Sequence, residues 1–359
     1  MGTKSKKGAI NRNLLVGLIT LSTFGLIACD DSSESSSEKD LTKNSGLEVS
    51  LFADGAFLQP PKIVDCETAQ GTATKCYQFI TSGAPAGRAP GPFCPRTIDD
   101  GADVSGSWFS KDGEGDLVDL TGNFILTLDD YYGDEKWLLY DAKTGKVRYT
   151  ADKASCSGAA RPDVEEQYKQ NCIECELSYL DEDFSLTYLI PSTPIPSAHA
   201  GRLHTVGIAL DGTELSGPAP ISEILGSYTI AAFDDCGGHI NLHQGYHYHS
   251  TTGCSNASVS DDGHAPLIGY AVDGYGIYAM RDAKGNEESL DECRGTTDDT
   301  RGYHYHAASP SENMFIGCLH GESVRPAGGP SGGGPDGGPP GGRPDGAPNE
   351  AGGPPPEHR

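Results

Sequence analysis

The sequence has 359 residues, with 51 acidic and 26 basic side chains and a formal net charge of −25 at pH 7. A chain of this length has room for two ordinary domains together with terminal appendages. A surface with this much negative charge repels nucleic acid, and the sequence contains no basic patch that would offset the repulsion. We therefore expect no nucleic-acid partner.

Residues 1–28 have the pattern of an export signal. Four basic residues lead into an uncharged stretch, residues 14–28, that is too short to cross a bilayer as a helix. It closes on LIAC at 26–29, which resembles the lipobox of bacterial lipoproteins, in which the signal is removed and the cysteine, here Cys29, is acylated. We therefore expect an extracytoplasmic protein tethered to a bacterial membrane through Cys29, in a leaflet that the sequence leaves open. An ordinary secretory signal is the alternative.

Two further segments lack the apolar residues that a folded core needs. Residues 29–46 read as an acidic, serine-rich spacer, and residues 323–359 as a tail of Gly, Pro, Asp and Arg. Both are predicted to be disordered. Removal of residues 1–28 would leave 22 basic residues against 51 acidic ones, a formal charge of −29.

Residues 47–175 are predicted to form a β-rich N-terminal region. β-favouring runs occur at 122–132 and 136–150, the second broken by a turn-like AKTG. The alternating acids of 112–120 have Leu117 where an EF-hand loop needs glycine, so a solvated turn is favoured over calcium binding. No nucleophile motif occurs in this region, and we expect it to support the part of the chain that follows.

A module of about sixty residues is written twice between residues 176 and 322. GYHYH at 245–249 recurs at 302–306, 57 positions later, and DDC at 234–236 is matched by DEC at 291–293. Because a repeated module does not bury its apolar face alone, we expect the two copies to pair about a pseudo-twofold axis. The predicted fold is therefore mainly β, with a duplicated, disulfide-stapled module after the β-rich N-terminal region.

Ten cysteines follow Cys29, and an even number in an exported chain most simply forms disulfides. The repeat suggests one disulfide within each module. CIEC at 172–175 has the spacing of a redox pair but lacks a strand-to-helix context, so structural bridging is favoured there. The suggested pairs are Cys236 with Cys254 and Cys293 with Cys318.

In an extended strand, GYHYH places its two histidines on one face and its two tyrosines on the other. Two such strands brought together would gather His247, His249, His304 and His306 into one cluster. Four imidazoles suit a transition-metal ion such as zinc or copper. The alternative is that each histidine is a hydrogen-bonded core residue.

The two modules differ beside the motif. His239 and His243 precede the first GYHYH, where the second module has threonines, and His264 lies in the segment that joins the motifs. We take His239 and His264 as further candidate ligands and place any chemistry near the first module. An ordinary surface role is favoured for His243 and His320.

Residues 179–320 resemble the YHYH domain family. The resemblance rests on both GYHYH copies and on LTYLIPSTPIPS, VGIALDG, DDCGGH, HAPLIGYAVDGYGIY and LDEC. It implies an exported domain and no particular reaction. Asp211 stands where the family pattern has asparagine, which leaves a ligand or turn role for that position open.

The predicted function is binding of a transition-metal ion, zinc or copper, by an anchored exported protein. One alternative is a glycan-binding or envelope-binding module, or a structural one, without metal. Another is a metal-dependent hydrolase or oxidase, in which Asp235 or Asp273 would act as the base toward a metal-polarised water.

Overall fold

The computed structural model describes residues 46–197, 203–255 and 262–324, all within one unit of the chain, Thr42–Arg359. The predicted export signal, the predicted lipidation site Cys29 and nearly all of the predicted spacer and tail lie outside the described residues. Within the described residues, no helix has the length and apolar character needed to cross a bilayer.

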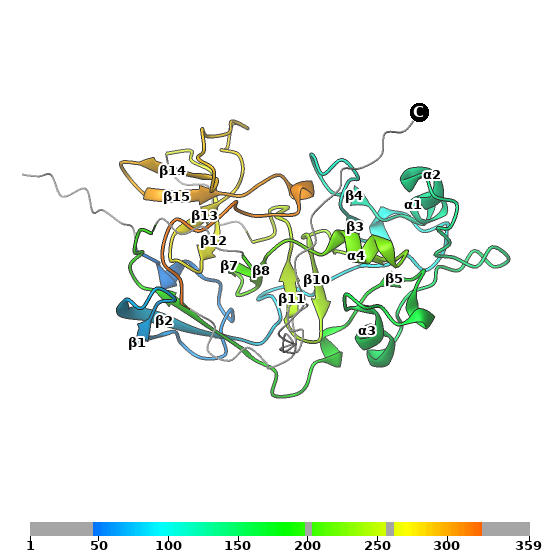
Figure 1. Cartoon of the computed structure of the whole chain (residues 1–359), viewed down its shortest axis with the longest axis horizontal. Helices are drawn as coiled ribbons and strands as arrows, with labels where there is room; N and C mark the ends of the chain where they lie inside the picture. Colours follow the sequence, from blue (N-terminus) through cyan, green and yellow to red (C-terminus); the bar gives the residue numbers. More distant parts are fainter. Residues whose placement is uncertain (1–45, 198–202, 256–261, 325–359) are drawn as a thin grey trace, which may run out of the picture. The chain divides into compact units, whose positions relative to one another are not determined.

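The fold is mainly β, and the strands of the described residues form four sheets (Figure 1). The strands of the N-terminal region are β1 (Lys62–Glu67), β2 (Ala73–Thr81), β3 (Ser107–Trp108), β4 (Val118–Asp119) and β5 (Cys172–Ile173). Those that follow are β6 (Leu186–Pro191), β7 (Thr205–Ala209), β8 (Glu214–Ser216), β9 (Ile230–Ala231), β10 (Gly238–Asn241), β11 (Gly245–Tyr248), β12 (Leu267–Ala271), β13 (Gly276–Tyr278), β14 (Gly295–Asp298) and β15 (Gly302–His306).

The helices are short. They are α1 (Gly122–Leu126), α2 (Leu128–Tyr132), α3 (Lys153–Ala159) and α4 (Ile221–Gly226), with 3-10 turns at Val49–Leu51, Ala102–Val104, Glu166–Tyr168, Leu177–Tyr179 and Pro310–Glu312. The β assignment of residues 122–132 is wrong, because this run forms α1 and α2. Thr121 caps α1 by accepting the amide of Phe124, and Gly133 ends α2 in the left-handed conformation. The second run does turn back on itself, with Tyr140 opposite Val147.

An eight-stranded sheet carries both GYHYH motifs, in the order β10-β11-β8-β7-β12-β13-β15-β14. The first four residues of the first motif form β11, which pairs antiparallel with β10 and parallel with β8. The second motif forms β15, which pairs antiparallel with β14 and parallel with β13. β7 and β12 pair at the centre, so four strands separate β11 from β15; Figure 1 shows the same neighbours.

The central strands are buried on both faces, which explains why VGIA and LIGYA read as apolar runs without alternation. One face packs on the tyrosines of the motifs, in a core that includes Tyr246, Tyr248 and Tyr305. The N-terminal region covers other parts: its aromatic residues pack with Phe233, and Phe79 packs with residues of β7 and β12.

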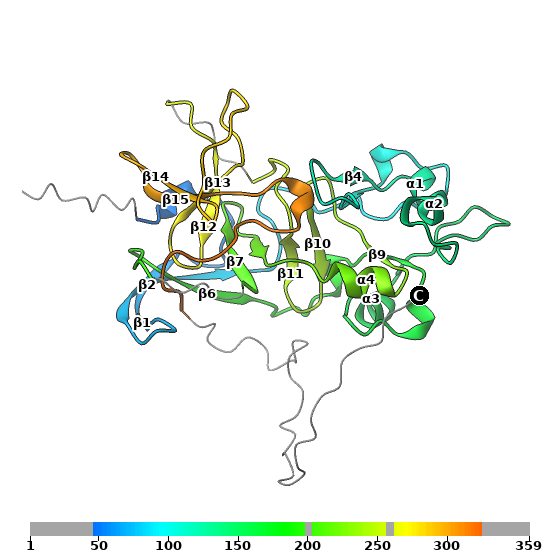
Figure 2. The same cartoon turned by 45° about the horizontal axis from the view of Figure 1, so that its top comes forward.

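Strands of the N-terminal region pair directly with strands of the region that follows. β2 pairs with β6, and β5 pairs with β9; β6 runs beside β2 in Figure 2. Five disulfides connect Cys66–Cys76, Cys94–Cys172, Cys156–Cys175, Cys236–Cys254 and Cys293–Cys318. The last two are the pairs that the repeat suggested. Cys172 and Cys175 have different partners, so CIEC is not a redox pair in this structure.

Candidate metal centres

Each GYHYH strand begins at a tight turn that fixes its direction. Gly245 and Gly302 have φ values of 67° and 66°, in the left-handed region that glycine tolerates best. In the first turn, the Asn241 side chain accepts the amides of residues 243 and 244. In the second, Asp298 accepts the amides of residues 300 and 301. The same turn chemistry therefore starts both strands.

The predicted alternation within the motif is confirmed. The rings of Tyr246 and Tyr248 contact each other at 5.3 Å between centroids, and the hydroxyls of these two tyrosines reach buried aspartates. The rings of His247 and His249 lie 5.0 Å apart. The histidines are thus gathered on the face of the strand opposite the tyrosines.

The first triad consists of His239, His247 and His249. His239 lies on β10 directly across from His247 on β11. One ligand atom from each of the three histidines lies within 4.8 Å of the other two. The Phe233 ring covers the cluster, with its centroid 5.0 Å from that of His239. The side chains of His247 and His249 are buried.

The second triad consists of His264, His304 and His306. The histidine that completes it, His264, does not occupy the position that corresponds to His239 in the first triad. Thr296 occupies the position across from His304 that His239 occupies across from His247. His264, in the segment before β12, supplies the third imidazole instead, again with ligand atoms within 4.8 Å. Each pair of motif histidines is therefore completed by a third histidine from a non-equivalent position.

The expectation of one cluster made of His247, His249, His304 and His306 is wrong, because the two pairs belong to separate triads. Five steps across the sheet separate β11 from β15. At about 4.8 Å a step, this corresponds to roughly 24 Å along the sheet. A dinuclear centre needs its ions about 3.5–4 Å apart, so the triads are two separate sites.

Backbone carbonyls fix the tautomers of the motif histidines. Nδ1 of His247 lies 3.0 Å from the Gly245 carbonyl oxygen, and Nδ1 of His304 lies 2.9 Å from that of Gly302. His249 and His306 make the corresponding bonds, each of 2.9 Å, to the carbonyls of residues 217 and 279. Because a carbonyl only accepts, each Nδ1 carries the proton and each Nε2 keeps a lone pair. Such bonds orient histidines that ligate metals.

In the second triad, these tautomers bring two unprotonated nitrogen atoms into contact. His264 also donates Nδ1–H to a carbonyl, that of Ala265, at 3.0 Å. Nε2 of His264 and Nε2 of His304 then face each other at 3.2 Å, each with a lone pair. Two lone pairs at this distance repel unless a cation or proton lies beside them. Two ligands on a tetrahedral zinc ion with bonds of 2.0–2.1 Å are separated by a similar distance, about 3.3 Å.

A buried polar atom without a hydrogen-bond partner also indicates a metal ligand in the second triad. Nε2 of His306 is buried and has no hydrogen-bond partner among the described residues. A buried polar group left unsatisfied costs about 1–3 kcal/mol. Neither triad, among the described residues, includes a carboxylate or a thiol. The donor set is three imidazoles, which suits zinc or copper better than calcium or magnesium.

Burial keeps five of the triad histidines neutral at neutral pH. It lowers the pKa of His249 to about 3 and that of His306 to about 4, with neighbouring histidines contributing in both cases. Burial also lowers the pKa values of His239, His247 and His304. Neutral imidazoles are the form that binds metal, so proton competition is weak at neutral pH.

The lowered pKa values predict how the metal-free protein responds to pH. The unfolded chain binds protons at its histidines near pH 6.5, whereas in the folded protein burial lowers the pKa of His306 to about 4 and that of His249 to about 3. Stability is therefore fully present above about pH 6.5 and falls as the pH drops below that value, by a few kcal/mol in all. Denaturant unfolding of chelator-treated protein between pH 7.5 and 5 measures the loss. The His249→Asn/His306→Asn variant should lose less, and an equal loss would contradict the assignment.

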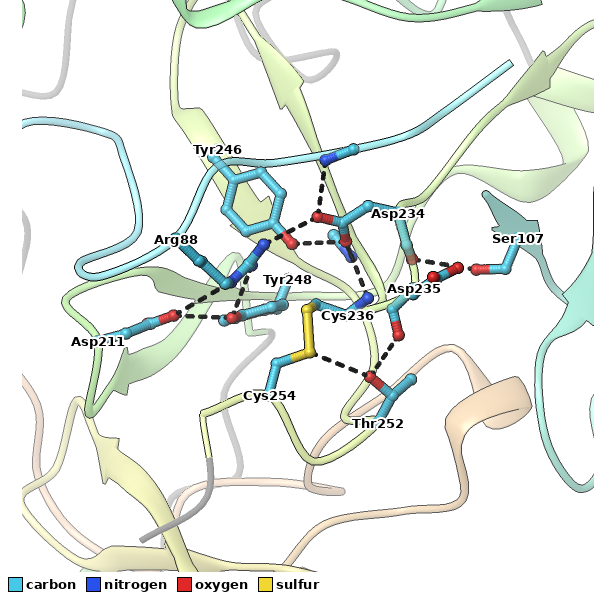
Figure 3. Close-up of a disulfide and its surroundings, with 12 residues drawn as sticks. Arg88, Ser107, Asp211, Asp234, Asp235, Cys236, Tyr246, Tyr248, Thr252 and Cys254 are labelled. Atoms are coloured by element: carbon cyan, nitrogen blue, oxygen red, sulfur yellow. Dashed lines mark hydrogen bonds and ion pairs between the residues drawn. A yellow bond between two sulfur atoms is a disulfide. The ribbon is translucent and has the colours of Figure 1, made fainter. Parts of the chain in front are cut away.

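On the opposite face, Arg88 from the N-terminal region binds the tyrosines of the first motif (Figure 3). Its Nη1 donates to Asp234 at 3.0 Å and its Nη2 to the Tyr248 hydroxyl at 2.9 Å. Tyr246 donates to Asp234 and Tyr248 to Asp211. Asp211, whose role the sequence left open, is thus a buried acceptor. Nothing in the sequence pattern marked Arg88, which lies 157 residues before Gly245.

The two candidate bases lie outside the triads. Asp273 is fully buried in the turn between β12 and β13, where it accepts the Tyr305 hydroxyl at 2.6 Å and the Gly321 amide at 2.9 Å. Burial raises its pKa. The side chain of Asp235 is exposed and, with Asp119, lines a cavity of about 700 Å³. Desolvation at the wall of this cavity and the neighbouring carboxylates of Asp234 and Asp119 raise the pKa of Asp235. A catalytic role for either aspartate stays a prediction.

The other histidines and the acidic run have ordinary surroundings. His243 is exposed in the turn between β10 and β11. His320 is half-buried and stacks on Tyr303 with 3.7 Å between ring centroids. In the acidic run 112–120, Asp112 accepts the hydroxyl of Ser110 and the amide of Glu114, as in a local turn. The only metal-capable groups among the described residues are the two triads.

The model of the family described as "YHYH protein" matches residues 187–289. The match includes the first GYHYH and the whole first triad, together with His264, and it ends before the second GYHYH. No curated protein matches the chain, and no solved structure matches it.

Proposed function

Because this chain carries a YHYH domain whose motif histidines lie in two triads, we propose that it binds two transition-metal ions, zinc or copper, one in each triad. The observation that carries the proposal is the contact of 3.2 Å between Nε2 of His264 and Nε2 of His304. Both rings already donate Nδ1–H to carbonyls, so a metal ion or a proton must lie beside the two Nε2 atoms to relieve the repulsion of their lone pairs, and a metal ion would use both lone pairs as ligands.

The composition of the triads supports the same metals. Imidazole suits zinc and copper, whereas calcium and magnesium prefer oxygen ligands. All ten cysteines of the described residues are in disulfides and cannot serve as thiolate ligands. With three protein ligands, a four-coordinate ion keeps one position for water or an exogenous ligand. Such an ion can be transferred or can polarise a bound molecule.

We propose further that the two halves of the eight-stranded sheet are copies of one module related by a pseudo-twofold axis. The order of the strands supports this, since from each end of the sheet an antiparallel hairpin is followed by a parallel neighbour of its GYHYH strand. The hydrogen bonds of the motif tyrosines also correspond between the two halves. Tyr246 and Tyr248 donate to Asp234 and Asp211 as Tyr303 and Tyr305 donate to Asp291 and Asp273.

We propose that the protein acts outside the cytoplasm, anchored through lipid on Cys29. The lipobox-like LIAC and the preceding apolar stretch support export. Five disulfides in the folded part fit an oxidising compartment. Labelling of expressing cells with a fatty-acid analogue tests the anchor, since the label should disappear in the Cys29→Ala variant.

Metal content of single variants tests the metal proposal. A soluble form that begins after Cys29 should retain about two equivalents of zinc or copper after exhaustive dialysis. His249→Ala should retain one, His306→Ala the other, and the double variant none, because each substitution removes one of three ligands from one triad. His243→Ala, which changes an exposed histidine outside the triads, should retain both.

Two results would contradict the proposal. A single equivalent lost in both single variants would indicate one shared site. No metal in a folded wild-type protein, even after reconstitution, would favour a glycan-binding or structural module with hydrogen-bonded core histidines.

A further inference from the structure

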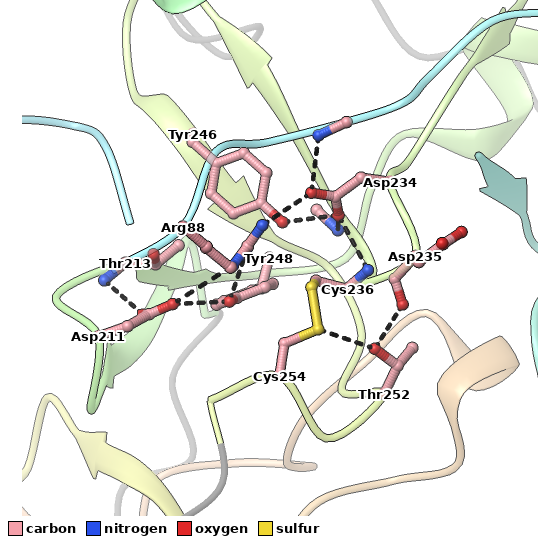
Figure 4. A network of polar contacts seen from close by, with 12 residues as sticks. Arg88, Asp211, Thr213, Asp234, Asp235, Cys236, Tyr246, Tyr248, Thr252 and Cys254 are labelled. Atoms are coloured by element: carbon pink, nitrogen blue, oxygen red, sulfur yellow. Dashed lines mark hydrogen bonds and ion pairs between the residues drawn. A yellow bond between two sulfur atoms is a disulfide. The ribbon is translucent and has the colours of Figure 1, made fainter. Parts of the chain in front are cut away.

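The first copy of the motif contains a seat for a guanidinium group (Figure 4). Arg88 pairs with Asp234 at 3.0 Å and donates to the Tyr248 hydroxyl at 2.9 Å. Its guanidinium carbon lies over the Tyr246 ring, 4.7 Å from the centroid. The carboxylate of Asp234 is almost fully buried beneath it, with 1% exposure. The seat is thus a carboxylate beside a tyrosine ring face.

The second copy has a corresponding carboxylate, that of Asp291, which accepts the same kinds of donors. Asp291 accepts the amides of Cys293 and Gly295 through one oxygen and the Tyr303 hydroxyl through the other. Asp234 likewise accepts the amides two and four residues later, but the same oxygen also accepts the hydroxyl of the first tyrosine of its motif, and the other oxygen binds Arg88. Asp291 and Tyr303 therefore correspond to Asp234 and Tyr246.

In the second copy no cation of the described chain pairs with the carboxylate. The Tyr305 hydroxyl accepts a hydrogen bond from the backbone amide of His320. This amide replaces the Arg88 guanidinium, which donates to the Tyr248 hydroxyl in the first copy. The ion pairs of the described residues include none to Asp291, which is exposed, unlike Asp234. The carboxylate is in place, and none of the described basic side chains forms an ion pair with it.

A cavity of about 760 Å³ opens at this carboxylate. Its lining includes Asp291, Glu292, both cysteines of the Cys293–Cys318 disulfide and His320, whose ring covers one face of the Tyr303 ring. Two carboxylates and a stacked pair of rings form an environment for a planar cation. Guanidinium fits better than ammonium, because its planar fork binds a carboxylate with two donors and stacks on ring faces.

We propose that this cavity binds a guanidinium group from outside the described chain, an arginine side chain of a peptide or protein partner. Arg88 in the first copy is the internal precedent for the ligand. The acidic surface of the protein would attract such a basic partner over a distance. The inference is independent of metal binding, because it uses the tyrosine face of the motif and not the histidine face.

Titration of the full soluble chain with an acetyl-Gly-Arg-Gly-amide peptide, followed by NMR or calorimetry, tests the proposal. Saturable binding is expected in the millimolar range. Asp291→Asn should weaken it about tenfold, the factor for loss of one charge-assisted hydrogen bond. Glu292→Gln should weaken it by a smaller factor, and Glu135→Gln, an equal charge change at a distant exposed site, should leave it unchanged.

The same peptide with citrulline in place of arginine separates charge from shape. It should not bind, because it keeps the shape but lacks the positive charge. If the citrulline peptide binds equally, if no saturable binding occurs, or if both the Asp291 and Glu292 variants keep full affinity, the proposal is overturned. Should Asp291→Asn fail to fold, Glu292→Gln decides, since the exposed Glu292 side chain has no hydrogen bond within the described chain to lose.

Discussion

Removal of the bound metal is expected to lower the melting temperature by about 10 °C or more. A ligand that binds only the native state stabilises it by about 2.7 kcal/mol per site at one hundred times its Kd, and there are two sites. In a folded region of this size, each kcal/mol corresponds to about 2–4 °C. Calorimetry with and without a strong chelator measures the shift.

The matched control for this experiment is His249→Ala/His306→Ala, which lacks one ligand in each triad. Its melting temperature should not respond to the chelator, and only the wild type should recover when zinc or copper is restored. An unchanged melting temperature in the wild type after complete removal of metal would mean that the triads are stable without an ion.

Replacement of Arg88 by alanine is expected to reduce the free energy of unfolding by about 3–5 kcal/mol. The substitution leaves the buried carboxylates of Asp211 and Asp234, 6% and 1% exposed, without their cation. Breaking one side of a buried charge pair costs about this much. Denaturant unfolding measures the change. Arg161→Ala removes an exposed ion pair with Asp163 and should cost at most about 1 kcal/mol.

The Arg88 substitution also separates the two faces of the motif. Because Arg88 contacts only the tyrosine face, the folded variant should still bind two equivalents of metal. A loss of less than about 1 kcal/mol would show that water replaces the guanidinium at little cost, and would also weaken its use as a precedent for the cavity at Asp291.

Local patterns predicted the strand character of GYHYH, because side chains alternate on a strand whatever its partners are. They also identified all six triad histidines as candidates. The sequence could not predict which third histidine joins which pair. His239 reaches His247 through the register of a hairpin, but His264 reaches His304 through a segment whose path depends on tertiary packing.

The expectation of a single cluster failed for a topological reason. A repeat predicts that equivalent strands are related by symmetry, but not how many strands lie between them. Here β8, β7, β12 and β13 separate the two motif strands. The helices at 122–132 were missed for a similar reason, because caps at Thr121 and Gly133 decide against the β-favouring side chains between them.

A crystal structure of the metal-loaded protein, with anomalous data collected at the absorption edge of the metal, will show whether each triad holds its own ion. Two anomalous peaks are expected, one bonded to Nε2 of His304 and His306 and to His264, the other bonded to His239, His247 and His249. One peak shared by both motifs, or triads without a peak in crystals grown with excess metal, would contradict the proposal of two metal sites.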